Sequence, residues 1–525
     1  MMIDRYVSRF TLCSLLLALL LSAAASAQNS PPDSQSGQQP VYQSQSVIRA
    51  TTRLVVVDLV ATSADGTPVS DLKQEDFTVL EEGVPQNIAA FSFLRPAAHT
   101  QITQHLAPGV ITNAPQYGAA SSYNIILLDA INTDFSSHAY AQDMLAKYLG
   151  SGPDIQPTAV FGLDGRLVLL HDFTTDSRIL REVVANFKPQ GPTHIPTVDA
   201  AASPFTRQGS FQTTPHGREV TFEAMRSIAL SMAGYPGRKN LIWISEGFPI
   251  NLFPDVTLGD GTVLIEDLSP LAEKIADELM NAQIALYTID AAGVTVNDRF
   301  SAHTAMISMA ERTGGKSFYN RNDIETGVRT SIDDGSTYYS LSYYPKNRTW
   351  DNKFRRIEIK VTRPGVKLKY RQGYYAQSPT LGESADAVSR SVSNALLPDA
   401  PASSGVVFQA AVLPPSPKTQ NQVVVNFGID PHTVAFEKKG DDLQHASISC
   451  VVWAYANAKK NDPVRSEGPS HNAALKPDEY LRMMKSYFPC QRTLSLKPGS
   501  YTLRLAVVDQ TTNLIGTATT SVTVP

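Results

Sequence analysis

Cysteine is scarce in this chain of 525 residues, which contains only Cys13, Cys450 and Cys490. Cys13 stands before an apolar run near the N-terminus, so it is a poor site for lipid attachment. Cys450 and Cys490 lie in one late β-rich region, and in an oxidising compartment a single disulfide between them is the economical interpretation. Two buried thiols are the alternative. Thiol catalysis is disfavoured if both cysteines are paired.

A strong charge of one sign is also lacking, since 45 basic and 49 acidic residues leave a net charge of −4 at pH 7. No basic run alternates with aromatic residues, so nucleic acid is excluded as a partner. The histidines form no His-x-x-x-His pair for zinc. The sequence has no phosphate-binding Gly-x-x-x-x-Gly-Lys-Ser/Thr loop and no Gly-x-Ser-x-Gly nucleophile turn. We therefore predict that the protein is not an enzyme.

Long apolar runs are confined to the N-terminal segment. Arg5 and Arg9 precede the run Leu15–Leu21, and Ala25-Ser26-Ala27 is a small-residue cleavage pattern. This arrangement predicts a signal peptide over residues 1–27 and a secreted or periplasmic protein. An uncleaved membrane anchor is the alternative, which the shortness of the run disfavours. No later stretch could span a bilayer, so no membrane span is expected after the signal peptide is removed.

Composition divides the rest of the chain into several parts, as its length requires. Residues 28–46 are polar and without periodicity, which predicts a disordered leader. Residues 47–95 form a β-rich N-terminal module, which residues 337–376 are candidates to complete. Residues 377–404 have the composition of a linker. Residues 405–525 contain short strands separated by turn residues, as in an immunoglobulin-like or fibronectin-like β-sandwich.

Residues 122–336 have a different pattern from the rest, with short apolar strands alternating with amphipathic helices. This alternation predicts an α/β domain with a mostly parallel sheet covered by helices on both faces. In such a sheet, ligands bind beyond the carboxyl ends of the strands. Two polar clusters fall there, namely Asp129-Ala130-Ile131-Asn132-Thr133 and Ser245-Glu246-Gly247. Carboxylates with nearby hydroxyls suit a hard divalent cation such as Mg²⁺.

Several motifs, taken in their order along the chain, resemble the VWFA-related family known mainly from acidobacteria, which is built on a von Willebrand factor type A (vWA) domain. The similarity covers residues 47–376, and the C-terminal domain contributes little to it. The motifs are Glu75-Asp76-Phe77-Thr78-Val79-Leu80-Glu81-Glu82-Gly83, Leu128-Asp129-Ala130-Ile131-Asn132-Thr133, Pro236-Gly237-Arg238-Lys239-Asn240, Thr313-Gly314-Gly315, Tyr338-Tyr339, Tyr343-Tyr344-Pro345 and Tyr370-Arg371-Gln372-Gly373-Tyr374.

The resemblance implies a Rossmann-like vWA fold and a metal-ion-dependent adhesion site that has become degenerate. The family pattern has Asp-x-Ser-x-Ser after the first strand, a Thr on a second loop and Thr-Asp-Gly after a later strand. Asp129 matches the first Asp and Thr133 the second hydroxyl, whereas Ile131 replaces the first Ser and Glu246 the later Asp. Asn132 could substitute only in a rearranged loop. The second-loop Thr corresponds to Thr193 or Thr197.

The candidate metal ligands are thus Asp129, Asn132, Thr133 and Glu246, and the implied cofactor is Mg²⁺ or another divalent cation. A metal-free fold with polar strand ends is the alternative, and Asn132-Thr133 would then be a helix N-cap. Two long loops, residues 197–218 and 248–266, are candidate binding surfaces.

The resemblance also implies a non-catalytic protein that mediates adhesion or binding to a protein or peptide. A metal-dependent hydrolase that uses Asp129 and Glu246, and a purely structural component of an envelope assembly, are the alternatives.

Overall fold

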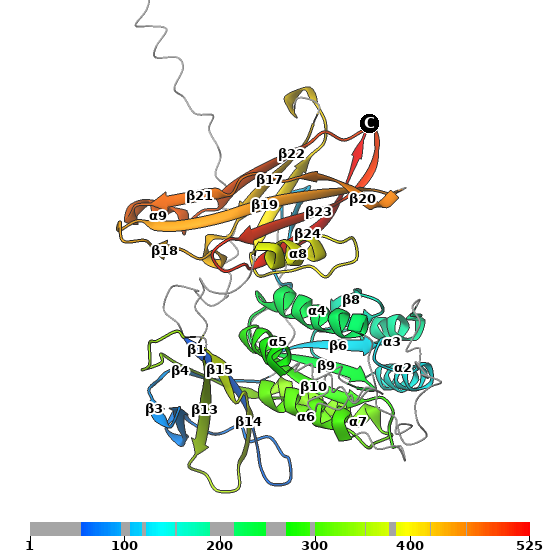
Figure 1. Ribbon diagram of the computed structural model, residues 1–525, viewed down its shortest axis with the longest axis vertical. Helices are drawn as coiled ribbons and strands as arrows, with labels where there is room; N and C mark the ends of the chain where they lie inside the picture. Colours follow the sequence, from blue (N-terminus) through cyan, green and yellow to red (C-terminus); the bar gives the residue numbers. More distant parts are fainter. Residues whose placement is uncertain are drawn as a thin grey trace, which may run out of the picture. The chain divides into compact units, whose positions relative to one another are not determined.

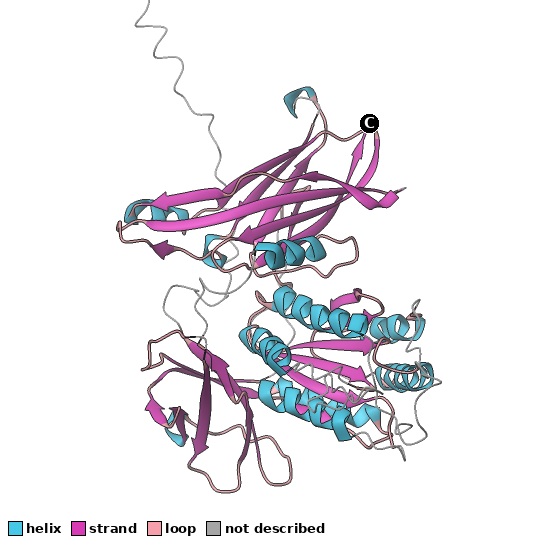
Figure 2. Cartoon of the chain, viewed as in Figure 1, coloured by secondary structure: helices cyan, strands magenta, loops and turns pink. Residues whose placement is uncertain are grey.

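The computed structural model describes residues 54–95, 106–117, 122–152, 155–189, 215–247, 269–294, 300–351, 353–376, 385–419, 422–457 and 459–525. The predicted signal peptide and leader, Thr193, Thr197 and almost all of the two long loops lie outside these residues. Helices and strands are both abundant (Figure 2), and the protein has a mixed α/β structure. Among the helices of the described residues, none is long and apolar enough to cross a membrane.

A six-stranded sheet with the order β11-β10-β9-β6-β7-β8 forms the centre of the α/β domain. Its strands β10, β9, β6 and β8 are labelled in Figure 1. All neighbours in this sheet are parallel except β7 and β8, which form a hairpin around Asp164-Gly165. The chain order reverses between β6 and β9, so the sheet is doubly wound and has its switch point there. The strands are β6 (Tyr123–Asp129), β7 (Thr158–Leu163), β8 (Leu167–Thr174), β9 (Lys239–Ser245), β10 (Ile284–Asp290) and β11 (Lys316–Phe318).

Helices cover both faces of this sheet because the buried strands are apolar on both sides. Along β6, Ile125 and Leu127 belong to one core cluster, whereas Ile126 and Leu128 belong to the other. The first cluster includes residues of α4 (Pro215–Met232), α5 (Ser269–Asn281) and α6 (Phe300–Thr313). The second includes residues of α2 (Phe135–Gly150), α3 (Ser177–Asn186) and α7 (Ile324–Ser336).

The N-terminal β-module consists of two four-stranded sheets, β14-β1-β12-β4 and β15-β13-β2-β3. Strands from residues 54–95 and from residues 337–376 alternate in the first sheet and pair through β13 and β2 in the second, so the two segments form one unit. The α/β domain enters the chain between β4 and β12, which are antiparallel neighbours. The strands are β1 (Val55–Thr62), β2 (Phe77–Glu81), β3 (Val84–Gln86), β4 (Ile88–Leu94), β12 (Tyr338–Tyr343), β13 (Phe354–Val361), β14 (Lys367–Tyr370) and β15 (Gly373–Tyr375); a short 3-10 helix, η1 (Gln74–Asp76), precedes β2.

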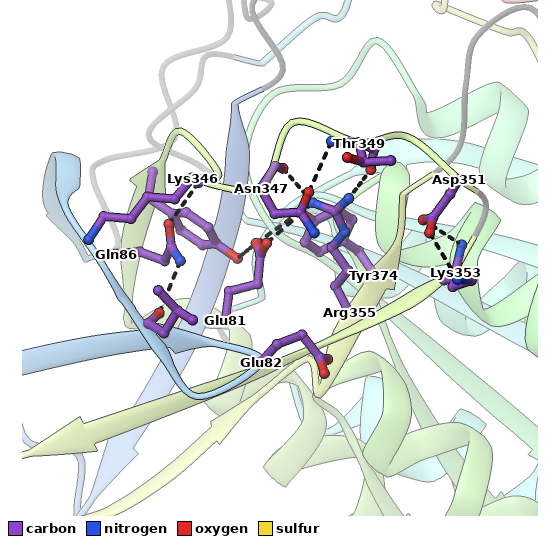
Figure 3. Close-up of polar contacts among 12 residues, drawn as sticks. Glu81, Glu82, Gln86, Lys346, Asn347, Thr349, Asp351, Lys353, Arg355 and Tyr374 are labelled. Atoms are coloured by element: carbon purple, nitrogen blue, oxygen red, sulfur yellow. Dashed lines mark hydrogen bonds and ion pairs between the residues drawn. The ribbon is translucent and has the colours of Figure 1, made fainter.

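Three of the sequence motifs converge on one buried carboxylate, Glu81, which is 2% exposed. The hydroxyls of Tyr343 and Tyr374 each donate to Glu81 Oε2 at 2.9 Å. The guanidinium of Arg355 lies 3.4 Å from Glu81 Oε1 and also donates to the carbonyl of Asn347 (Figure 3). Burial, followed by the Glu81 charge, raises the pKa of Tyr343 above its usual range, so this hydroxyl remains a donor. These motifs therefore hold the β-module together.

Three motifs meet at the amino ends of the parallel strands, on the opposite edge of the sheet from Asp129. Buried Arg238, directly before β9, donates from Nη2 to the Tyr287 hydroxyl at 3.1 Å and to the Gly314 carbonyl at 3.0 Å. Its backbone N–H donates to the Tyr338 hydroxyl at 3.1 Å. These contacts connect the α/β sheet to the β-module, at the edge of the sheet opposite Asp129.

The C-terminal part forms two antiparallel sheets that share one core. One sheet has the order β22-β17-β16-β5, and the other contains β18, β19, β23 and β24, with β20 and β21 also paired to β19. Short helices α8 (Ala385–Ala395) and α9 (Pro477–Met483) and two 3-10 helices, η3 (Pro417–Thr419) and η4 (Pro431–Thr433), flank these sheets. The strands are β5 (Val110–Thr112), β16 (Phe408–Leu413), β17 (Val423–Ile429), β18 (Glu437–Lys438), β19 (Gln444–Ala456), β20 (Lys459–Ser466), β21 (His471–Leu475), β22 (Phe488–Leu494), β23 (Gly499–Asp509) and β24 (Ile515–Val524).

The edge strand β5 comes from the segment between the β-module and the α/β domain, which has the composition of a linker. Asn113, which is 8% exposed, fixes β5 to the C-terminal sandwich. Its amide donates to the carbonyls of Ser403 (2.7 Å) and Val406 (2.8 Å), and its side-chain oxygen accepts from Phe408 N (2.8 Å). One edge strand of the sandwich therefore comes from a segment about 290 residues earlier in the chain.

A disulfide joins Cys450 of β19 to Cys490 of β22 and so connects the two sheets of the sandwich. Cross-linking residues 40 apart restricts the unfolded chain. We expect the Cys450→Ser/Cys490→Ser variant to lower the free energy of unfolding of the C-terminal domain by about 2–4 kcal/mol, measured by urea denaturation. Reductant added to the wild type should reproduce the loss and should leave the double variant unchanged; equal stability of both proteins would contradict the prediction.

A buried carboxyl on α5 predicts a pH dependence of stability. Burial raises the pKa of Asp277 to about 7, and the nearby cation of Arg312 opposes the shift. The folded state therefore binds a proton that the unfolded state has lost, so stability falls as the pH rises from about 4 to about 7. The full pKa shift would lower the free energy of unfolding by roughly 4 kcal/mol, as an upper limit, across this pH range.

We expect the free energy of unfolding of Asp277→Asn to exceed that of the wild type by about 2 kcal/mol at pH 8. At pH 4 the two proteins should have nearly the same stability. Denaturation curves at the two pH values measure this difference. An equal difference at both values would show that ionisation of Asp277 is not its cause.

Candidate functional site

The carboxyl edge of the sheet brings three acidic residues to neighbouring strand ends. Leu128 is in register with Ile244, and Ser245 is in register with Asp290. Asp129, Glu246 and Asp290 therefore lie side by side at the carboxyl ends of the neighbouring strands β6, β9 and β10. This edge contains the switch point, where ligands bind in open α/β sheets.

Asp129 is fully buried, and protein donors occupy both of its carboxylate oxygens. Oδ1 accepts the backbone N–H groups of Ile131 (3.0 Å) and Asn132 (2.9 Å). Oδ2 accepts from the side chains of Asn132 (2.8 Å), Trp243 (3.0 Å) and Ser245 (2.9 Å). Burial raises the pKa of Asp129, and these donors act against the rise. A carboxylate offers about four lone-pair positions, so five donors leave none for a cation.

Asn132 is also fully buried, and its amide is held in one orientation. Nδ2 donates to Asp129 Oδ2 and to the hydroxyl of Thr221 at 2.7 Å, and that hydroxyl donates to the Gly217 carbonyl. A flipped amide would place its oxygen against the carboxylate, so the orientation follows from these partners. Among the described residues, Asn132 Oδ1 has no hydrogen-bond donor and is left as a buried acceptor.

Thr133 and Glu246 join the two loops by a reciprocal pair of hydrogen bonds. The Glu246 N–H donates to the Thr133 hydroxyl at 3.1 Å, and Glu246 Oε2 accepts the Asp134 N–H at 2.9 Å. The N-cap of α2 is Asp134, whose side chain accepts from Ser137 N, so the prediction of a cap at Asn132-Thr133 is wrong by one or two residues. The cap lies later in the chain because Asn132 already donates its backbone and side-chain N–H groups to Asp129. The Ile131 side chain packs on the core and supplies no oxygen.

These residues do not fit a divalent cation as they stand. Asp129 is saturated, and the Glu246 carboxylate accepts the N–H at the start of α2. Among the described candidate ligands, Asn132 Oδ1, Thr133 Oγ1 and the Glu246 carboxylate retain some acceptor capacity, which is short of an octahedral oxygen shell. Within the described ranges, no group of three or more His, Cys, Asp or Glu side chains is arranged to hold a metal. Thr193 and Thr197, the candidates for the second loop, fall outside those ranges.

His303 is an edge residue that the sequence did not reveal. Its Nε2 lies 2.7 Å from Asp290 Oδ2, while Asp290 Oδ1 accepts from Ala292 N. The His303 ring also lies against Tyr319, with 4.8 Å between centroids. His303 comes 13 residues after Asp290 and on another element, so no local spacing could have paired them. The pair joins the end of β10 to the start of α6.

Two large apolar side chains are exposed at the same edge. Phe135, the first residue of α2, is 74% exposed, and Val294, in the loop after β10, is 64% exposed. Asn322 connects α2 to the residues after β10. The Tyr140 hydroxyl of α2 donates to the Asn322 carbonyl at 2.7 Å, and Asn322 Oδ1 accepts from Val294 N at 2.9 Å. Exposed apolar side chains that gather at one place mark interaction surfaces more often than isolated ones do.

No protein-family model and no curated protein matches the chain. Among solved structures, a von Willebrand factor type A structure from Catenulispora acidiphila is 9% identical, with 84% of this chain and 74% of that chain covered and a TM-score of 0.25. The vWF domain of the type V pili tip protein Mfa5 from Porphyromonas gingivalis is 14% identical, with 44% and 97% covered and a TM-score of 0.25.

Proximal thread matrix protein 1 from the mussel byssus is 11% identical, with 41% of this chain covered and a TM-score of 0.27. The match spans 48% of the byssal protein, which is about half of its length. At these TM-scores the likenesses carry no weight for the function of this chain. The α/β assignment rests on its own strand order and packing.

Proposed function

We propose that this is a non-catalytic secreted or periplasmic protein of the VWFA-related family known mainly from acidobacteria. It binds another protein or peptide through the carboxyl edge of a vWA-like domain. The motif order supports the family, and the doubly wound sheet with its single antiparallel hairpin supports the domain type. The N-terminal apolar segment supports export.

The observation that carries this proposal is the use of the candidate metal ligands in hydrogen bonds within the protein. Asp129 binds five donors, and Glu246 with Thr133 joins the two loops of the edge. The degenerate adhesion site is thus a rigid polar core that fixes the shape of the edge. Binding that uses this edge is then independent of metal, and no activated water is available for hydrolysis.

The exposed edge residues supply the contact surface in this proposal. Phe135 stands at the start of α2, directly after the Asp134 cap that Glu246 helps to fix. Aromatic side chains of this kind dominate protein interfaces when a partner covers them. A rigid base with a protruding aromatic residue therefore fits binding to an apolar pocket or surface of another protein.

Site-specific photo-crosslinking in the producing cell tests this proposal. A crosslinking residue at position 135 is expected to capture a defined protein adduct, and a chelator is expected not to reduce the yield. Position 481 is the matched control, because Leu481 on α9 is also 58% exposed but lies far along the chain in the C-terminal sandwich. Equal adducts at both positions, or none at 135, would refute the proposal. Metal-dependent turnover in an esterase, phosphatase and peptidase panel would favour the hydrolase alternative.

A further inference from the structure

A second surface of the protein is a cleft of about 800 Å³ between the end of α6 with β11 and the strands β13 and β14, which are consecutive in the chain but belong to different sheets. Its volume is in the range of protein clefts that hold ligands, roughly 300–1,000 Å³. The cleft is lined by consecutive residues of each strand, namely Gly315-Lys316-Ser317, Arg356-Ile357-Glu358 and Leu368-Lys369-Tyr370. Alternate residues of a strand point to opposite faces, so a lining of consecutive residues means that strand edges, rather than a sheet face, border the cleft.

Two of these strands have a neighbour on one side only within the described part of the chain. β11 is the last strand of the six-stranded sheet and pairs with β10, while β14 is the last strand of its four-stranded sheet and pairs with β1. Free strand edges present unpaired N–H and C=O groups, which an added strand can satisfy. The cleft therefore places two such edges against one space.

The two edges meet at Gly314, which closes one end of the cleft. Gly314 has a φ of +80°, and a Cβ there would lie 2.8 Å from Arg371 N and 2.8 Å from the Tyr370 carbonyl carbon. β11 runs away from this point, and β14 runs toward it. The edges are therefore joined at one end and open at the other. Both sides belong to sequence motifs, Thr313-Gly314-Gly315 and Tyr370-Arg371-Gln372-Gly373-Tyr374, which the carboxyl-edge site does not use.

The charges along the cleft favour an acidic occupant. Lys369 pairs with Asp334 at 2.5 Å, and Glu358 pairs with Lys360 at 3.4 Å. In the described residues no carboxylate forms an ion pair with the side chain of Lys316 or Arg356, both of which line the cleft, although the Asp334 charge also acts on Lys316 and the Glu82 carboxylate accepts the Arg356 N–H. Glu311 also lines it and offsets one of these two charges. Partial burial, together with the positive charge of Lys369, lowers the pKa of Lys316, so an incoming carboxylate would be favoured there.

We propose that this cleft binds an extended acidic peptide segment of a partner protein, which adds as a strand to the free edge of β11 or β14. Main-chain hydrogen bonds would supply affinity, and Lys316 and Arg356 would select acidic side chains. The site is separate from the carboxyl edge, so each can bind without the other.

Selection from two decapeptide libraries tests the proposal on residues 28–525. One library carries Asp or Glu at alternate positions, the other Lys or Arg, and the remaining positions are randomised without proline. We expect enrichment of the acidic library only, and roughly tenfold weaker binding of the selected peptides to Lys316→Glu/Arg356→Glu. Lys353→Glu is the matched control, because Lys353 lies directly before β13 and is 80% exposed, and neither Lys353 nor its ion-pair partner Asp351 lines the cleft. Phe135→Ser should leave the affinity unchanged, which separates this site from the carboxyl edge.

Amide hydrogen exchange on the wild type provides a readout that needs no variant. Bound acidic peptide should slow exchange at residues 315–317 or 368–370, and a backbone N-methylated copy of the same peptide should lose this effect. Protection elsewhere, equal enrichment of both libraries, or no enrichment of either would overturn the proposal.

Discussion

Asp129→Ala is expected to lower the free energy of unfolding of the α/β domain by about 3–5 kcal/mol. The substitution removes the acceptor of the Trp243 indole N–H and of two backbone N–H groups, those of Ile131 and Asn132. It also leaves the Asn132 amide with Thr221 alone and the Ser245 hydroxyl with the Gly247 carbonyl, and Asp129 and Asn132 are both fully buried. A buried donor that loses its partner costs roughly 1–3 kcal/mol. Urea denaturation in a Trp350→Phe/Trp453→Phe background, where Trp243 is the remaining tryptophan, measures the loss by fluorescence.

Two variants separate this effect from general damage. Asp129→Asn keeps the shape but turns one acceptor into a donor that faces other donors, so we expect a loss nearly as large as in Asp129→Ala. Asp143→Ala breaks an exposed ion pair with Lys147, and we expect a change within about 0.5 kcal/mol. A stable Asp129→Ala protein would contradict the structural role of this carboxylate.

Glu81→Ala is expected to destabilise the β-module by about 3–5 kcal/mol. Arg355 is only 3% exposed, and the substitution would leave its guanidinium buried without a carboxylate. The hydroxyls of Tyr343 and Tyr374 would lose their common acceptor at the same time. Because the module contains strands from both sides of the α/β domain, we expect exchange to accelerate in β1, β2, β12 and β13 together. Hydrogen exchange by mass spectrometry measures this.

A double-mutant cycle shows whether the buried charge pair causes the loss. Arg355→Met combined with Glu81→Met removes both charges, so the double variant should be more stable than the sum of the single losses predicts. Glu358→Ala, which removes half of an exposed ion pair on β13, is the control and should change stability by less than about 1 kcal/mol. Additive losses in the cycle would mean that Glu81 and Arg355 act independently.

The hydrophobic pattern was sufficient to predict the α/β domain. Strands such as Tyr123–Asp129 and Lys239–Ser245 are buried along their whole length, which is why they read as continuous apolar runs. The hairpin at Asp164-Gly165 followed from its turn residues. The structure contains the disulfide that the location of Cys450 and Cys490 favoured.

The local sequence pattern could not predict contacts between residues that are far apart in the chain. β5 is three residues long and gains its place from Asn113, whose partners lie about 290 residues later. The partners of Asp129 also come from distant positions, since Trp243 is 114 residues away. Residue types at the strand ends suggested a metal site, but only the geometry shows that hydrogen bonds occupy the carboxylate. The part of the site on residues 193–197 lies outside the described structure.

Calorimetric titration of residues 28–525 with Mg²⁺, Mn²⁺ and Ca²⁺ tests the central claim most directly. We expect no saturable heat with any of the three cations, because Asp129 has no free lone pair and Glu246 is bound to Asp134 N. The same titration of Glu246→Gln, which keeps an acceptor for that N–H, should give the same flat trace. Saturable binding by the wild type that is lost in Glu246→Gln would contradict the account and would establish a functional metal-ion-dependent adhesion site.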